Sequence, residues 1–348
     1  MNFPLISIII INYNGKDLLK RFLPSILNLN YPNYEVILVD NASTDGSIEF
    51  LKNNYPKFKI IRVDKNYGTA EGGNIGARYA KGEYLFFISN DMELDKYILN
   101  YMIERMDEDK CIGICTCKMK RINESGEKIN IIDSVGADLD ISGFPSARGI
   151  NQIDYGQYDY FTEVFFSFGG AMLIRKKIFD RIGGYDSLFF TLADDIDLSW
   201  RVRLLGYKVM VEPKAFLYHQ SSATLGLKLR RSQKRFLSER NTLRMLLKNY
   251  SLTYLSFILP LYLIIFFAEI CFFIVVGRFG IAKNVFNSLI WNIKNLKTTL
   301  LKRKDIQKVR KIKDRDIFIL MLKRSEKIRM FWDYLKNPNA KHWERYFR

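Results

Sequence analysis

Three continuous apolar runs mark the first hundred residues, and each is followed by a polar side chain. Ile6 to Ile11 precedes Asn12, Val36 to Val39 precedes Asp40, and Leu85 to Ile88 comes shortly before Asp91. Unbroken Ile, Val and Leu runs are typical of parallel strands covered on both faces. Ligands of open α/β sheets bind beyond the carboxyl ends of such strands. We therefore expect Asn12, Asp40 and Asp91 to meet around one nucleotide pocket.

The segments between these runs carry helical patterns. Apolar residues have helical spacing from Lys16 to Leu29, a helix is expected from near Gly46 with Ser43 or Thr44 as its cap, and a third strand at Ile60 to Val63 precedes a helix that runs to about Ala80. Strands and helices that alternate over such a length predict an α/β fold with a doubly wound, mostly parallel sheet.

The last of these helices begins in a glycine-rich stretch, NYGTAEGGNIG, which contains Gly68, Gly72 and Asn74. Glycines at a helix start let the backbone approach a ligand closely. The spacing is not GxGxxG, so close packing against the sheet is the alternative. Its position along the chain between Asp40 and Asp91 favours a donor-binding loop.

Two further groups of polar residues are candidates for chemistry. Asp91 leaves an apolar strand at the sheet edge, where it can hold a hard divalent cation that bridges phosphate oxygens, or cap a helix starting near Leu94. Asp194, Asp195 and Asp197 crowd a predicted helix start, either as capping groups or with one of them as a general base. His219 follows a predicted strand, Val209 to Tyr218, and either completes a metal site with Asp91 or is structural.

The last third of the chain differs in charge and hydropathy. Residues 1–220 carry 26 Lys and Arg against 29 Asp and Glu, whereas residues 221–348 carry 28 against 8. Leu252 to Val276 is apolar with one charge, Glu269, and at about 1.5 Å per residue is long enough to span a bilayer. Both flanks are basic, so a single span, a re-entrant or interfacial hairpin with Ile281 to Leu300 as an amphipathic surface helix, and a buried core helix remain open.

The termini and cysteines indicate the compartment. MNFPLISIII has no basic segment before its apolar run, which favours a strand over a signal peptide and a catalytic part on the cytoplasmic face of the membrane. Cys111, Cys115 and Cys117 lack a zinc spacing, and we expect buried strand thiols. The basic region lacks a nucleic-acid recognition module, so we expect no nucleic-acid partner. The expected domains are a catalytic part at 1–250, a membrane-associating part at 251–300 and a basic helical tail at 301–348.

Taken together and in order, the motifs resemble the inverting glycosyltransferases of family 2, which have the GT-A fold, and in particular their rhamnosyltransferase-like branch. The likeness covers roughly residues 5–250. The motifs are SIIIINYNG at 7–15, LVDNASTDGS at 38–47, NYGTAEGGNIG at 66–76, FISNDMEL at 87–94, GGYDSLFF at 183–190 and DDIDLSWR at 194–201.

The resemblance implies a role for each matching residue. Asp40 corresponds to the aspartate that binds the pyrimidine base, and Asp195 to the catalytic base. Asp91 ends the metal-binding triplet Ser89-Asn90-Asp91, whose first acidic position is serine here, and His219 lies where relatives place a histidine near Mg²⁺ or Mn²⁺. Asn12, Asn14, Gly68, Gly72, Asn74 and Asn90 belong to the donor side, and Asp194, Asp197, Gly169, Gly170, Trp200 and Arg201 to the acceptor side.

The expected reaction is transfer of a sugar from a nucleotide-diphosphate donor to a hydroxyl of a glycan or polyprenyl-linked acceptor, in one inverting displacement. The acceptor is expected against residues 133–160, and an anionic membrane surface at the basic tail. A nucleotidyltransferase would need a glycine- and lysine-rich triphosphate loop near the start, and a catalytically inactive membrane scaffold would leave the three aspartates without a shared role.

Overall fold

The computed structural model describes residues 3–123, 125–168, 170–220 and 231–337. The chain forms two compact units, one of residues 1–137 and 147–228 and one of residues 138–146 and 229–348. The catalytic part was expected to end at residue 250, whereas the long stretch of the second unit begins at residue 229 and includes the helix Arg231–Asn249. The predicted position Gly169 lies outside the described residues.

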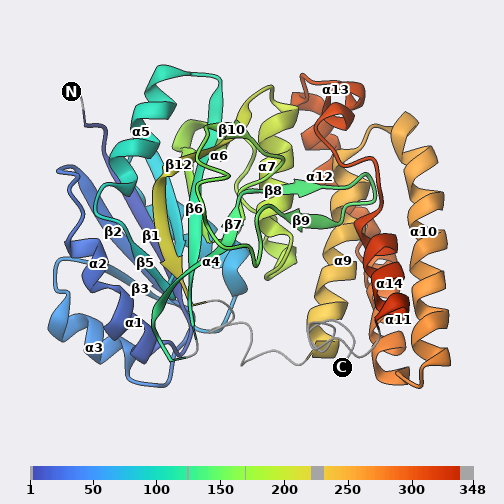
Figure 1. Ribbon diagram of the computed structural model, residues 1–348, viewed down its shortest axis with the longest axis horizontal. Coiled ribbons are helices and arrows are strands. Elements are labelled where there is room, and N and C mark those ends of the chain that lie inside the picture. Colours follow the sequence, from blue (N-terminus) through green and yellow to red (C-terminus); the bar gives the residue numbers. More distant parts are fainter. Residues whose placement is uncertain (1–2, 124, 169, 221–230, 338–348) are drawn as a thin grey trace. The chain divides into compact units, whose positions relative to one another are not determined.

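Strands and helices alternate through the first half of the first unit (Figure 1). The elements there are β1 (Ile6–Asn12), α1 (Lys16–Phe22), α2 (Pro24–Leu27), β2 (Tyr34–Asp40), α3 (Ser47–Asn54), β3 (Lys59–Arg62), α4 (Gly68–Tyr79), β4 (Tyr84–Ser89), β5 (Met92–Leu94) and α5 (Ile98–Glu108). The later elements of this unit are β6 (Ile112–Ile122), β7 (Lys128–Val135), β10 (Thr162–Glu163), β11 (Ala171–Arg175), α6 (Lys176–Arg181), the 3₁₀ helix η1 (Ser187–Phe189), α7 (Asp194–Leu204) and β12 (Lys208–His219). The short strands β8 (Ala137–Leu139) and β9 (Pro145–Ala147) form a separate two-stranded sheet, and most of their residues belong to the 138–146 stretch of the second unit.

The main sheet has the order β10-β12-β6-β11-β4-β1-β2-β3, with β5 paired to β12 and β7 to β6. The strands β4, β1, β2 and β3 are parallel, as expected for strands joined by helical crossovers. The other half is mixed, because β11 enters antiparallel between β4 and β6. The predicted α/β class is confirmed.

Alternate residues of β1 serve the two faces of the sheet. Ile6, Ile8 and Ile10 belong to the core that also contains apolar side chains of α1, α2 and α5. On the other face α4 packs against β1 and β2, where an added Cβ at Gly76 would lie 2.4 Å from the side chain of Ile9. Burial on both faces explains the continuous apolar run in the sequence.

Several local predictions are wrong in detail. The segment expected as one helix from Lys16 to Leu29 is two, α1 and α2, because Pro24 begins the second. Gly46, in the left-handed conformation, precedes α3 in place of a Ser43 or Thr44 cap. Cys115 and Cys117 are buried in β6, where burial raises the pKa of the Cys117 thiol to about 12, but Cys111 is exposed.

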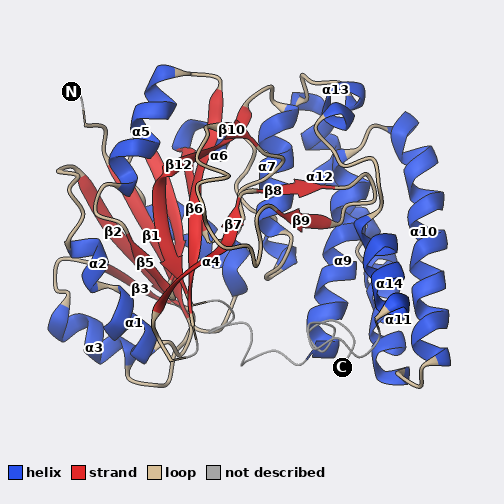
Figure 2. Ribbon diagram, in the orientation of Figure 1, coloured by secondary structure: helices blue, strands red, loops and turns tan. Residues whose placement is uncertain are grey.

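The long stretch of the second unit is almost entirely helical (Figure 2). Its helices are α9 (Arg231–Asn249), α10 (Leu252–Val275), α11 (Phe279–Lys294), α12 (Leu296–Val309), α13 (Asp314–Ile319) and α14 (Glu326–Lys336). The surface helix expected from Ile281 to Leu300 is therefore divided between α11 and α12. Among the described residues, α10 is the one helix long and apolar enough to cross a membrane.

Candidate active site

The carboxyl ends of β1 and β2 meet at Asp40. Asn12 lies opposite Asp40 in the parallel register, and its amide donates to the Oδ1 of Asp40 over 2.9 Å. The amide of Asn90 donates to the Oδ1 of Asn12 over 2.8 Å, and the backbone N–H of Ser43 donates to the Oδ2 of Asp40. These four residues form the Asp40 cluster. The structure thus joins three of the predicted donor-binding residues.

Asp40 has no exposed surface. Its carboxylate therefore organises the turns that follow β1 and β2. Asn14 bridges the same two turns, because its Oδ1 accepts the backbone N–H of Thr44 over 2.7 Å. Asn14 has a φ of +47°, a conformation that asparagine tolerates better than most residues.

At the glycine-rich start of α4, the space beside Gly68 is filled by the backbone of Phe190. Gly68 has a φ of +77°, and a Cβ there would lie 2.1 Å from the carbonyl oxygen of Phe190. That oxygen accepts the backbone N–H of Ala70 over 3.2 Å. At Gly72 a Cβ would meet the side chain of Ile11 at 3.1 Å, so this glycine lets α4 pack closely on β1.

The loop before α7 holds an unusual backbone. Phe190 has φ +63° and ψ −67°, and the N–H of Thr191 donates to the carbonyl of Phe189 over 2.7 Å, which closes a γ-turn of a rare and strained kind. Leu192 and Ala193 also have positive φ values. Such conformations cost on the order of 1–3 kcal/mol each and cluster at functional sites.

The strained loop leads into the acidic start of α7. Asp194 accepts a hydrogen bond from the hydroxyl of Thr69 over 2.8 Å, and burial raises the pKa of Asp194. Asp195 is half-buried, and its Oδ1 accepts the backbone N–H of Ile196. The amide of Asn41, which directly follows β2, donates to the carbonyl of Gly68. The next residue, Thr69, donates to Asp194, so these hydrogen bonds connect the end of β2 to the start of α7.

Three residues of α7 that were predicted as acceptor-side or supporting residues anchor the helix. Asp197 and Arg201 form a buried ion pair of 2.8 Å. Arg201 also donates to the carbonyls of Ile182 and Gly184. Trp200 is fully buried and meets a phenylalanine ring edge to face. These contacts hold α7 in place behind Asp194 and Asp195.

A second polar cluster forms around Asp91, where β5 pairs with β12. Met92 lies opposite His219 in the antiparallel register, which places the Nε2 of His219 3.5 Å from the Oδ1 of Asp91. The Nδ1 of His219 lies 2.8 Å from Asp133, and Asp133 pairs with Arg121 at 2.9 Å. We call these four residues the Asp91 cluster. The helix cap proposed as an alternative for Asp91 is wrong, because Met92–Leu94 is a strand.

The Asp91 cluster fits a divalent cation. The Oδ1 of Asp91 is buried and has no hydrogen-bond partner, and neighbouring ligands of an octahedral ion at about 2.1 Å lie about 3 Å apart. A metal-bound histidine commonly donates its other N–H to a carboxylate, as His219 does to Asp133 in the matching tautomer. Among the described residues no three His, Cys, Asp or Glu side chains form a metal-holding group, so a cation here would also need oxygen atoms of a substrate.

The pKa of His219 is shifted by burial and by the two carboxylates beside it. Burial lowers the pKa of the imidazole, but the hydrogen bond to Asp133 and the charges of Asp133 and Asp91 outweigh it and raise the pKa to about 10. Two carboxylates therefore favour a positive charge at this position, and a cation that binds Nε2 would have to displace its proton. Sequence reasoning missed Asp133 and Arg121, although Asp133 follows two isoleucines just as Asp40 follows an apolar run.

Two other predicted positions have structural contacts. The amide of Asn74 donates to the backbone carbonyl of Tyr185, and its Oδ1 accepts the backbone N–H of the same residue. Gly170 sits where a Cβ would lie 2.0 Å from the end of Met92, one residue after Asp91. Asn74 thus ties α4 to the 183–190 turn, and Gly170 makes room beneath the Asp91 cluster.

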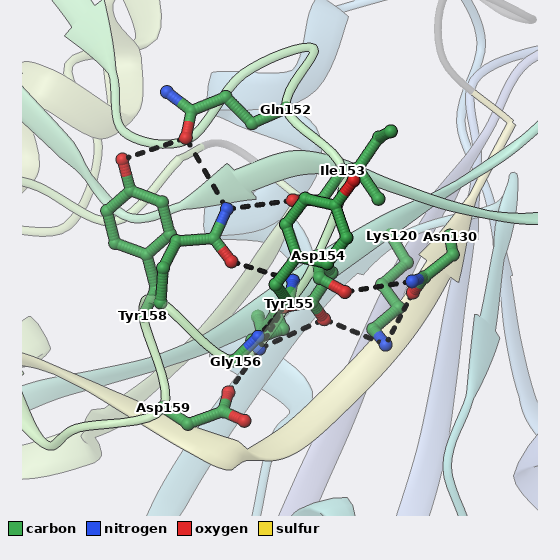
Figure 3. Close-up of polar contacts among 11 residues, drawn as sticks. Lys120, Asn130, Gln152, Ile153, Asp154, Tyr155, Gly156, Tyr158 and Asp159 are labelled. Atoms are coloured by element: carbon green, nitrogen blue, oxygen red, sulfur yellow. Dashed lines mark hydrogen bonds and ion pairs between the residues drawn. The ribbon is translucent and has the colours of Figure 1, made fainter.

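The segment expected to meet the acceptor is held by a buried carboxylate (Figure 3). Asp154 forms ion pairs with Lys118 and Lys120 of β6, at 3.0 and 2.8 Å. The amide of Asn130 donates to the backbone carbonyl of Asp154. The adjacent Tyr155 is 80% exposed, so a firmly anchored loop presents an aromatic ring to solvent.

Two family models match overlapping parts of the chain. A family model described as Glycosyl transferase family 2 matches residues 7–183, and one described as Glycosyl transferase family group 2 matches residues 150–283. The first model includes the Asp40 cluster and Asp91. The second includes Asp195 and His219.

Curated relatives match about two thirds of the chain. Poly-beta-1,6-N-acetyl-D-glucosamine synthase of Staphylococcus epidermidis is 28% identical over 227 residues, which is 64% of this chain and 51% of that protein. O-antigen biosynthesis protein RfbC of Myxococcus xanthus is 25% identical over 228 residues, 64% of this chain and 18% of that protein. The chain therefore spans about half the length of the first relative and less of the second.

Two solved structures share the fold. GalNAc-T7 with UDP, GalNAc and Mn²⁺ has a TM-score of 0.57 at 17% identity, with 74% of this chain and 50% of that chain covered. Mannosyltransferase PcManGT from Pyrobaculum calidifontis, in complex with GDP-Man and Mn²⁺, has a TM-score of 0.51 at 17% identity, with 89% and 86% covered. This likeness confirms the predicted GT-A fold.

Proposed function

We propose that this chain, which belongs to glycosyl transferase family 2, transfers a sugar from a nucleotide-diphosphate donor to a hydroxyl of a glycan or lipid-linked acceptor, with inversion at the anomeric carbon. The observation that carries this proposal is the Asp91 cluster. It contains a buried carboxylate oxygen without a hydrogen bond, next to an imidazole that is braced by a second carboxylate. A rhamnosyltransferase-like donor specificity remains a prediction.

The Asp40 cluster is the proposed nucleotide side of the site. Asp40 acts there by fixing Asn12 and the turn at Ser43, so that the loops after β1 and β2 keep the shape that receives the base. Asn14 bridges these loops and limits their motion. A preorganised pocket of this kind lowers the entropic cost of binding the donor.

The Asp91 cluster is the proposed diphosphate side. Asp91 and His219 would hold Mg²⁺ or Mn²⁺, which neutralises charge on the departing diphosphate. Asp133 keeps the Nε2 of His219 directed at Asp91 through the bond at Nδ1. The serine at position 89 removes one family carboxylate, so a cation here would also need oxygen atoms of the diphosphate.

Asp195 is the proposed general base. The acceptor oxygen forms a bond to the anomeric carbon while the bond from that carbon to the diphosphate oxygen breaks, and the hydroxyl proton passes to the carboxylate of Asp195. Thr69 and Asp194 position the start of α7 for this step. The strained Phe190 loop fixes the backbone immediately before it.

The acceptor is proposed to lie against residues 133–160 and to be attached to a lipid at the cytoplasmic face of the membrane. The apolar helix α10 and the basic charge of residues 221–348 support this location. Tethering to the membrane raises the local concentration of a lipid-linked acceptor without any new contact at the site.

The proposal is tested with the purified full chain, a panel of nucleotide sugars and Mn²⁺. Asp195→Asn is expected to lower transfer by about 10²–10⁴-fold while donor binding persists. Asp40→Ala should weaken nucleotide binding, measured by calorimetry. Asp180→Asn, at an exposed carboxylate of α6, is the control and should match the parent chain. Full turnover in Asp195→Asn removes Asp195 from the base role.

A further inference from the structure

The second unit exposes an unusual amount of apolar side chain on two neighbouring helices. On α10, Phe257, Ile264 and Val275 are 73%, 68% and 85% exposed. On α11, Phe279 and Ile293 are 65% and 64% exposed. These positions are 7 and 11 residues apart on α10 and 14 residues apart on α11, which are close to whole numbers of helical turns, so they lie in one stripe along each helix. The two helices pack against each other.

The opposite side of α10 is fastened by buried charges, which we call the Glu269 lock. Glu269 forms ion pairs with Arg235 of α9 and with Lys327 of α14. Glu239 of α9 pairs with the same two cations at 3.1 and 3.0 Å. It also accepts the hydroxyl hydrogen bond of Tyr262 over 3.0 Å. The lock joins three helices into one bundle.

The order of these contacts shows that α9 and α10 form an antiparallel hairpin. Tyr262 meets Glu239, and further from the turn Glu269 meets Arg235, so α10 runs back along α9. Besides Arg235, α9 buries three cationic side chains within the unit: Arg240, Arg244 and Lys248. If α10 crossed the hydrocarbon core with this packing, α9 would enter the core as well. Cationic side chains near the centre of the hydrocarbon core are strongly disfavoured.

We infer that the second unit binds the surface of an anionic bilayer with α10 lying in the plane of the membrane, held there by the Glu269 lock and inserted through the stripe of Phe257, Ile264 and Val275. This inference deepens the membrane location proposed above and rests on it. It decides between the span and the interfacial hairpin that the sequence left open.

The charge around this apolar stripe indicates that a lipid surface, and not a second copy of the chain, covers it. Lys283, Lys294 and Lys297 are exposed along α11 and at the start of α12, between exposed apolar residues. Residues 221–348 carry 28 basic against 8 acidic side chains, so two copies facing each other would repel. Anionic headgroups would attract the same lysines.

The inference is tested by measuring membrane depth at three positions of the full chain. Nitroxide labels are placed by Phe257→Cys, Ile264→Cys and Val275→Cys, in a background in which the exposed Cys111 and Cys271 are serine. The protein is bound to vesicles of phosphatidylcholine with about 30% phosphatidylglycerol. Depth comes from the relative accessibility of each label to oxygen and to a water-soluble nickel chelate. A label from Lys52→Cys on α3 is the control outside the membrane.

An in-plane helix should give the same shallow depth, about 5–10 Å, at all three positions. A crossing helix would place position 264 deepest and positions 257 and 275 towards opposite surfaces, since they are about 27 Å apart along the axis. That profile overturns the inference. A chain that dimerises without lipid and ignores vesicles overturns it as well.

A second measurement separates this inference from the proposed reaction. Ile264→Asp combined with Val275→Asp should weaken binding to anionic vesicles at least about tenfold, whereas Ile264→Leu should leave it unchanged. Transfer to a water-soluble acceptor should persist in both variants, because these side chains are remote in sequence from the proposed donor and base residues. If the parent chain shows no transfer to a water-soluble acceptor, the proposed reaction is wrong. If the aspartate variant binds vesicles as well as the parent chain does, the inferred membrane binding is wrong.

Discussion

Asp91 and Glu269 look alike in the sequence and differ in the structure. Each is a lone carboxylate beside or inside an apolar run, and each is buried. Asp91 meets a single imidazole, that of His219, at 3.5 Å. Glu269 meets two cationic side chains, Arg235 and Lys327.

The difference teaches that the partners of a buried carboxylate, more than its burial, indicate its role. Arg235 and Lys327 come from two other helices, so Glu269 serves to hold helices together. Asp91 instead meets an imidazole, which it shares with Asp133. An imidazole can coordinate a metal once its Nε2 has lost its proton, whereas guanidinium and ammonium groups cannot, so of the two carboxylates Asp91 has the neighbour that can share a cation with it.

The largest effect is expected from Asp91→Asn. The amide keeps the size of the side chain but loses its charge, so transfer supported by Mn²⁺ should fall by about a thousandfold or more. The free energy of unfolding should change little, because Asp133 still pairs with the imidazole of His219. Transfer assays over a Mn²⁺ titration and urea unfolding give the two readouts.

Glu93→Gln is the matched control for Asp91→Asn, since Glu93 lies two residues away and makes a surface ion pair with Lys128. It should retain transfer. If Asp91→Asn lowers the stability of the chain but keeps the specific activity of the folded fraction, Asp91 has a structural role like that of Glu269, and the comparison of the two carboxylates is wrong.

Glu269→Gln should affect stability and not the transfer reaction. Removing this charge leaves Arg235 and Lys327 buried with Glu239 alone, which should lower the free energy of unfolding by about 3–5 kcal/mol. Urea unfolding of the full chain in detergent micelles measures it. Asp316→Asn, at a carboxylate 49% exposed, should cost no more than about 0.5 kcal/mol. Equal stability of Glu269→Gln and the parent chain would show that the lock is dispensable.

Asp133→Asn tests whether His219 is positioned for a cation. The amide still accepts from Nδ1 but no longer balances charge, so the affinity for Mn²⁺ should fall about 10–100-fold. Calorimetric Mn²⁺ binding in the presence of nucleotide diphosphate measures this without relying on turnover. Arg121→Gln removes the other partner of Asp133 and leaves the imidazole bond in place. It should change Mn²⁺ affinity little, and an equal loss in both variants would mean that the whole cluster is merely structural.

The parts of the site that could be predicted from the sequence are those fixed by neighbouring strands. The apolar runs placed Asn12 and Asp40 at adjacent strand ends, and the structure pairs them in register. The same reasoning found the strand that carries His219, since Val209 to Tyr218 lies within β12. Alternation of buried faces is a local property, so it is visible in a single chain.

The contacts that escaped prediction join segments far apart in the chain. Phe190 fills the helix start at Gly68, and Asp133 reaches His219 across 86 positions. Neither pairing has a periodic signal, because each depends on how loops fold over the sheet. The Glu269 lock likewise needs three helices, so a lone glutamate in an apolar run could not reveal it.

The smallest expected effect concerns Asp154, a carboxylate of the first unit that should behave like Glu269 because its partners are two lysines. Burial raises its pKa, but hydrogen bonds from Lys120 and Lys118 outweigh this and lower the pKa to about 2. The ordinary value is 3.8, so the carboxylate contributes stability above that pH and loses the contribution as the pH falls towards 2. Asp154→Asn should therefore lower the free energy of unfolding by about 1–2 kcal/mol at pH 7. The difference from the parent chain should shrink between pH 4 and about pH 2. Urea unfolding at pH 7, 4 and 3 measures the trend, and a difference that stays constant over this range would mean that the ion pairs contribute nothing and that partner identity does not predict the role.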